Sequence, residues 1–131
     1  MCLLRYYRDG RLLHAGAHED ILVCPRGDGP CRRVAALGTW IGGVSDIGRA
    51  TVPGTIQLEE GDTVVLLTDG VAEARNEKHE LFGPDRLCDA VERMRHLPVD
   101  ELRKAVLDEV LRWAPRPEDD ISLVVLRYRA P

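Results

Sequence analysis

The sequence has 131 residues and a formal net charge of −4 at pH 7, from 18 Lys and Arg against 22 Asp and Glu. This length predicts a single domain with a sizeable core, and the scattered basic residues give no surface of the kind that binds nucleic acid. No apolar run approaches the roughly 20 residues of a membrane-spanning helix, and charges interrupt the N-terminal apolar segment where a signal peptide would be continuous, so we expect a cytoplasmic protein without a membrane or nucleic-acid partner.

The first half of the chain is predicted to be rich in strands. Two apolar segments within residues 2–16 flank Asp9 and Gly10, a dipeptide typical of a two-residue hairpin with a primed turn. Further strands are expected in "DILVCP" and, more weakly, in "CRRVAAL". Glycines and prolines then punctuate residues 38–55, which predicts a loop that leads into a strand near residues 55–58.

The second half changes its hydrophobic period. The segment "TVVLL" has no polar alternation, which is typical of a strand covered on both faces. Gly83 and Pro84 then mark the start of a helix, and a second helix is expected over residues 99–113. The segment "ISLVVLRYR" ends the chain as another strand without alternation before Arg127.

These elements predict an α+β layered fold. Residues 64–67 and 123–126 are expected to form central, adjacent antiparallel strands, because their continuous apolar character requires cover on both sides. The helices near residues 85–95 and 99–113 should then pack on one face of the sheet.

The four cysteines form no C-x-x-C pair; they are Cys2, Cys24, Cys31 and Cys88. In a reducing compartment cysteines remain thiols. We therefore expect small buried side chains or free thiols at these positions, and no zinc site.

Acidic residues lie at the ends of the two predicted central strands. Asp69 follows "TVVLL", and Asp119 and Asp120 precede "ISLVVL". In an antiparallel pair these ends are level, so three carboxylates would share one rim, and such an oxygen cluster suits Mg²⁺ or Mn²⁺. The alternative is that Asp69 only forms a turn with Gly70 and that residues 118–120 are a solvated acidic run, which is the commoner meaning of such patterns.

Two longer segments favour the metal site. "LLTDGVAEARNEKHELFGPDRL" together with "EDDISLVVLRYR" resembles the C-terminal part of the SpoIIE/RsbU-type serine phosphatases, a bacterial branch of the metal-dependent PP2C-like phosphatases. "AGAHEDILV" and "GTWIGGVSDIG" resemble the middle section of that family, in the same order. The resemblance covers essentially the whole chain and implies one domain over residues 1–131, built as a layered α-β-β-α sandwich of PP2C type.

The resemblance also implies roles for individual residues. Asp69 and Asp119 match metal ligands of the family, and Asp120 is a weaker candidate ligand beside them. Gly70 would let the backbone turn tightly next to the metal, and Glu73 would structure the following loop. Two Mn²⁺ or Mg²⁺ ions are implied for the complete family domain.

The activity implied is hydrolysis of phosphoserine or phosphothreonine by a metal-activated water. The substrate implied is a small bacterial regulatory protein of the anti-anti-sigma type, in a switch that controls a sigma factor. His18 aligns with a histidine of the family's middle section, and we interpret it as a structural hydrogen-bonding residue rather than a ligand.

One family feature is missing from the sequence. The Gly-Gly-Asp and Asp-x-x-Gly-His segments, which supply the aspartate that bridges two metals in the family, do not occur. We therefore expect roughly the C-terminal two-thirds of the domain, either as a truncated piece or as a natural short form, with a weak or partial metal site and little activity. A second subunit in a homodimer could supply a substitute carboxylate. The alternative function is a non-catalytic module that binds a phosphoprotein or another phosphatase chain.

Overall fold

The computed structural model describes residues 2–38, 46, 48 and 51–131, so most of the predicted loop over residues 38–55 lies outside the described residues. The strands are β1 (Cys2–Tyr6), β2 (Arg11–Gly16), β3 (Ile21–Cys24), β4 (Arg32–Val34), β5 (Gly54–Gln57), β6 (Thr63–Leu67) and β7 (Leu123–Arg127). The helices are α2 (Asp69–Ala72), α3 (Gly83–Met94) and α4 (Val99–Trp113). No helix in this part of the chain has the length and apolarity needed to cross a membrane.

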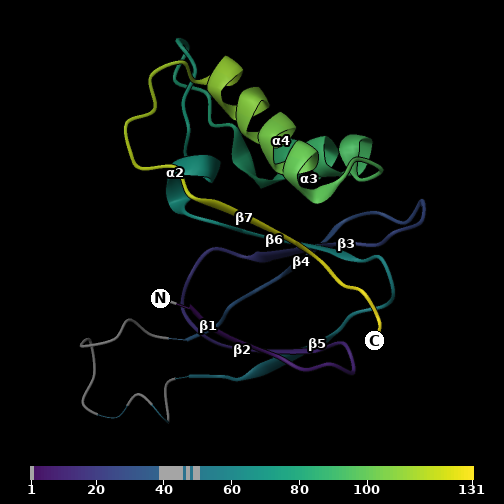
Figure 1. Cartoon of the computed structure of the whole chain (residues 1–131). Coiled ribbons are helices and arrows are strands. Elements are labelled where there is room, and N and C mark those ends of the chain that lie inside the picture. The colour runs from purple at the N-terminus through teal and green to yellow at the C-terminus, as the bar shows by residue number, and fades with distance from the viewer. Residues whose placement is uncertain (1, 39–45, 47, 49–50) are drawn as a thin grey trace.

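The elements form stacked layers (Figure 1). A three-stranded sheet has the order β1-β2-β5, and a four-stranded sheet has the order β4-β3-β6-β7. Helices α3 and α4 cover the outer face of the four-stranded sheet, as predicted. In the described residues the three-stranded sheet, the four-stranded sheet and the helices are therefore stacked in that order. The α+β class is confirmed.

Strand β6 is covered on both faces. Val65 is fully buried in the core beneath α3 and α4, whereas Val64 is buried in the core between the two sheets. Both helices turn apolar side chains such as Val91 and Val106 toward the first of these cores. The absence of alternation in "TVVLL" therefore correctly predicted a central strand.

Strand β7 contradicts its prediction. It pairs antiparallel with β6 as expected, but it lies at the edge of the four-stranded sheet. Val125 is only 7% exposed, whereas Val124 is 48% and Leu126 is 46% exposed. The prediction that β7 is central was therefore wrong. A run of apolar residues does not reveal the order of strands in a sheet, and the described residues leave the apolar side chains on the second face of β7 uncovered.

The predicted hairpin of β1 and β2 is confirmed, but its turn is of a different type from the one predicted. The Tyr7 N–H donates to the Arg11 carbonyl at 2.8 Å, and the Gly10 N–H donates to the Tyr7 carbonyl at 3.1 Å. Gly10 has a φ of 83°, but Asp9 does not have a positive φ. A primed turn of type I′ needs positive φ at both central residues, so the loop is instead a three-residue turn that ends in a left-handed glycine.

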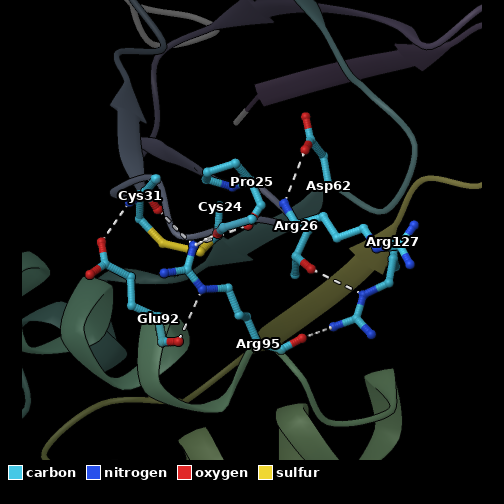
Figure 2. Close-up of a disulfide and its surroundings, with 11 residues drawn as sticks. Cys24, Pro25, Arg26, Cys31, Asp62, Glu92, Arg95 and Arg127 are labelled. Atoms are coloured by element: carbon cyan, nitrogen blue, oxygen red, sulfur yellow. Dashed lines mark hydrogen bonds between the residues drawn. A yellow bond between two sulfur atoms is a disulfide. The ribbon is translucent and has the colours of Figure 1, made fainter.

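Two cysteines are joined, contrary to the prediction of free thiols. Cys24 at the end of β3 forms a disulfide with Cys31, which precedes β4 (Figure 2). The antiparallel pairing of β3 with β4 returns the chain to its starting point and brings the two sulfurs together. Cys2 and Cys88 are free thiols.

Candidate metal site at one rim of the four-stranded sheet

The acidic segments meet where β6 ends and β7 begins. The last strand pair is Leu67 with Leu123. Beyond it the Thr68 N–H donates to the Ser122 carbonyl at 3.1 Å, and the Ser122 N–H donates to the Thr68 hydroxyl oxygen at 2.9 Å. The Thr68 hydroxyl in turn donates to the Asp120 carbonyl at 3.0 Å. Thr68 is thus hydrogen-bonded to the segment that carries Asp119 and Asp120.

Gly70 allows these two segments to touch. A Cβ atom at Gly70 would lie 2.5 Å from the Asp120 carbonyl oxygen and 3.3 Å from that of Asp119. A separation of 2.5 Å is a steric clash with backbone, which cannot rotate away as a side chain can. Because Gly70 does not have a positive φ, glycine is required here for close approach and not for backbone handedness.

The three predicted ligands are open to solvent. Asp69, Asp119 and Asp120 are all exposed, and within the described ranges none of them forms an ion pair. Asp69 accepts the Gly70 N–H at 3.0 Å, and Asp119 accepts the Asp120 N–H at 2.7 Å. Such local hydrogen bonds also occur in simple turns, but they leave most lone pairs of the carboxylate oxygens free to coordinate a cation.

Two further acidic residues reach the same rim. Strand β3 runs antiparallel to β6, so the residues before β3 emerge where β6 ends. Glu19 and Asp20 occupy these positions and help to line a cavity of about 120 Å³ together with Leu66 and Leu67. They were not among the predicted ligands, although the sequence offered a signal: an acidic pair directly before an apolar strand, as before β7.

His18 lines the same cavity but is tied to its own neighbour. Its Nδ1 accepts the Glu19 N–H at 2.7 Å. A ring nitrogen that accepts a backbone N–H is not free to bind a metal through the same lone pair. This contact agrees with the interpretation of His18 as a structural residue.

The block after Asp69 folds on itself. The Glu73 N–H donates to the Asp69 carbonyl at 2.7 Å and ends α2, while the Glu73 side chain is exposed. Further along, the Asn76 side-chain oxygen accepts the N–H groups of Lys78 and Glu80 at 2.9 and 3.0 Å. These bonds hold a compact turn against the end of α4, where the Trp113 ring N–H donates to the Glu80 carbonyl at 3.1 Å.

The rim offers the right kind of donor for a hard cation but not a complete shell. Carboxylate oxygens suit Mg²⁺ and Mn²⁺, which take about six ligands. Among the described residues no three His, Cys, Asp or Glu side chains lie close enough together to hold a metal ion.

The family profile for stage II sporulation protein E (SpoIIE) matches residues 1–129. The chain belongs to the SpoIIE family. This SpoIIE-family chain is 37% identical to phosphoserine phosphatase RsbU of Bacillus subtilis (strain 168) over 73 residues, which are 55% of the chain and 22% of RsbU. The family assignment made from the sequence is thus confirmed.

Solved structures show the same fold. The SpoIIE-family chain matches the RsbU and RsbW domains of Rv1364c from Mycobacterium tuberculosis with a TM-score of 0.79 and 24% identity, over 99% of the chain and 36% of that structure. It matches the manganese-presoaked phosphatase domain of SpoIIE from Bacillus subtilis with a TM-score of 0.68 and 21% identity, over 100% of the chain and 57% of that domain. The fold is that of PP2C-type phosphatase domains, and the chain spans only part of each relative.

Proposed function

We propose that this chain forms part of a metal-dependent protein serine/threonine phosphatase domain. The observation that carries the proposal is the contact between the Asp69 segment and the Asp119–Asp120 segment, made close by Gly70 at an exposed rim. Support also comes from membership of the SpoIIE family and from similarity to RsbU, a phosphoserine phosphatase. The proposed substrate is a phosphorylated bacterial regulatory protein of the anti-anti-sigma type.

In this proposal Asp69 and Asp119 bind Mn²⁺ or Mg²⁺, with Asp120 as a weaker candidate. When bound, such ions lower the pKa of a coordinated water and stabilise charge on the phosphate oxygens. The chain itself positions the carboxylates: Thr68 fastens the end of β6 to the start of β7, and Gly70 brings the two backbones into contact. The exposure of the rim leaves room for a phosphoserine on a protein substrate.

We further propose that the site needs more carboxylates than Asp69 and Asp119. Asp20 lies just before β3, which is next to β6 and two strands from β7, so Asp20 is one strand from Asp69 and two strands from Asp119. Neighbouring strands lie about 4.8 Å apart. The family's bridging aspartate belongs to segments that this sequence does not contain. The chain alone should therefore bind metal weakly and turn over slowly.

A specific observation favours the second candidate function. The Gly-Gly-Asp and Asp-x-x-Gly-His segments are missing from the sequence, and this favours a non-catalytic role in binding a phosphoprotein or another phosphatase chain. The two candidates differ in whether phosphate is released.

The test is hydrolysis of p-nitrophenyl phosphate with Mn²⁺, measured for the 131-residue chain and for a longer chain that adds the Gly-Gly-Asp and Asp-x-x-Gly-His segments. We expect little turnover by the short chain, clear turnover by the longer one, and loss of turnover on Asp69→Asn. Asp108→Asn, an exposed change on α4, is the matched control and should keep full activity. An inactive longer chain would favour the binding module, and rapid turnover by the short chain would show that the ligand count is wrong.

A further inference from the structure

A basic pocket opens at the end of the four-stranded sheet that lies opposite the carboxylate rim. It has a volume of about 410 Å³. The side chains that set its charge are Arg26, Glu60, Arg95, His96, Arg127 and Arg129. Arg127 pairs with Thr63 at the start of β6, and four residue steps separate this pair from the pair at the rim. At about 3.3 Å per step, roughly 13 Å of strand lies between the two ends.

The charge of this pocket is not balanced. Four guanidinium groups line it against the single carboxylate of Glu60, which already accepts the Ala130 N–H. Asp62 lies nearby, but it is buried in the turn before β6, where it accepts the N–H groups of Arg26 and Glu59. In the part of the chain that the structure describes, none of the four arginines forms an ion pair. Such a concave region of one sign concentrates anions.

Two of the arginines are held in place by neutral partners. Arg127 donates to the Thr63 hydroxyl at 3.2 Å and to the carbonyls of Leu97 and Arg95 at 2.9 and 2.7 Å. Arg95 donates to the Pro25 carbonyl at 3.1 Å and to two more carbonyls of the loop that the disulfide closes (Figure 2). Carbonyl oxygens fix a guanidinium without cancelling its charge, so the pocket is positive before any ligand arrives.

The other two arginines are free to move onto a ligand. Arg26 and Arg129 are exposed, and their side chains make no hydrogen bond to any described residue. They belong to different segments, the loop after β3 and the end of β7, and both line the pocket. Planar guanidinium groups match phosphate oxygens with paired hydrogen bonds, which a lysine cannot reproduce.

From this arrangement we infer that the basic pocket is a second binding site, for a small oligophosphate anion such as pyrophosphate or the phosphate chain of a nucleotide. Arg95 and Arg127 provide the fixed positive floor, and Arg26 and Arg129 close on the anion. The volume falls within the range of small-molecule sites and exceeds the needs of a single water or halide. The site is independent of the proposed phosphatase centre, because no rim carboxylate lines it.

The experiment is calorimetric titration of the chain with pyrophosphate, and separately with ATP, in low salt and EDTA so that no metal bridges the ligand to the rim. We expect one bound anion per chain and an affinity that falls with added salt. The double variant Arg26→Ala/Arg129→Ala should weaken binding at least tenfold, and Arg26→Lys should weaken it less. Both changed positions are exposed, so an unchanged thermal midpoint will show that folding is intact.

The matched control removes the same charge elsewhere. Arg103→Ala/Arg116→Ala changes two exposed arginines outside the pocket and should alter pyrophosphate affinity less than twofold. Asp69→Asn should leave the affinity unchanged, which separates this site from the metal rim. The proposal is overturned if pyrophosphate and ATP both fail to bind, or if the two double variants weaken binding equally.

Discussion

At the scale of single residues, Gly70 decides whether the two acidic segments can meet. Its missing Cβ leaves room for the Asp120 carbonyl, which would otherwise lie at a clashing distance. The dipeptide Asp-Gly is common in turns, where glycine serves for its positive φ. Here glycine allows close contact with the segment before β7, and this role could not be deduced from the dipeptide alone.

Gly70→Ala should lower the free energy of unfolding by about 1–3 kcal/mol, as expected for overpacking against rigid backbone. The sign is informative, because alanine in place of glycine inside a helix normally stabilises by up to about 1 kcal/mol. Gly27→Ala is the control, since a Cβ there meets no atom within 4 Å. Chemical denaturation of both variants measures the difference, and an equal effect of the two changes would contradict the clash.

Asp9 gives a pH-dependent prediction at the first hairpin. The Arg11 side chain and backbone N–H both donate to its carboxylate and lower the pKa of Asp9 below its ordinary value of 3.8. A group whose pKa is depressed in the folded state stabilises the fold above its unfolded pKa and loses that effect as the pH falls. Asp9→Asn should therefore lower the unfolding midpoint at pH 7, and the difference from the wild-type chain should shrink progressively as the pH falls below 3.8. A difference that does not change with pH would contradict this account.

At the scale of secondary structure, the strands and the helices α3 and α4 formed where local patterns predicted them, whereas the short helix α2 lies where a turn was expected. Each has a signal of its own, such as Gly83 and Pro84 at the start of α3 or the apolar run in β6. The edge position of β7, the disulfide and the hairpin turn were not predicted. Each of them depends on what lies beside the segment in space, which periodicity does not encode.

Strand β7 offers a matched pair of valines. Val125→Asp should abolish folding, because an unpaired carboxylate in the core beneath the helices costs several kcal/mol against a total of about 5–15 kcal/mol. Val124→Asp, one residue earlier on the exposed face, should cost at most about 1 kcal/mol. Circular dichroism and thermal melting distinguish these results. If Val124→Asp also unfolds the chain, the second face of β7 is covered in solution.

The disulfide should stabilise the chain by constraining its unfolded state. Cys24 and Cys31 are seven residues apart, and a loop of this size contributes roughly 2–3 kcal/mol. Adding a reductant should lower the unfolding midpoint of the wild-type chain and should have no effect on Cys31→Ala. Alkylation of the unfolded, unreduced protein should label Cys2 and Cys88 only. Labelling of all four cysteines would show that the pair is open.

At the scale of the whole molecule, the four-stranded sheet carries opposite charge at its two ends. Carboxylates gather where β6 ends, and arginines gather where β6 begins. Antiparallel pairing alone predicted that the segment carrying Asp69 meets the segment carrying Asp119 and Asp120 at one rim. The basic pocket could not, because its arginines come from segments that are distant in sequence and meet only through the fold.

The account depends most on Asp69 and Asp119 sharing one cation. The direct measurement is titration with Mn²⁺ followed by electron paramagnetic resonance, for the wild-type chain, Asp69→Asn, Asp119→Asn and the double variant. We predict one weak Mn²⁺ site. Either single change should abolish binding at this site, and the double variant should show no further loss. Mn²⁺ binding that survives both changes, or losses that add as if at two separate sites, would contradict a shared metal at this rim.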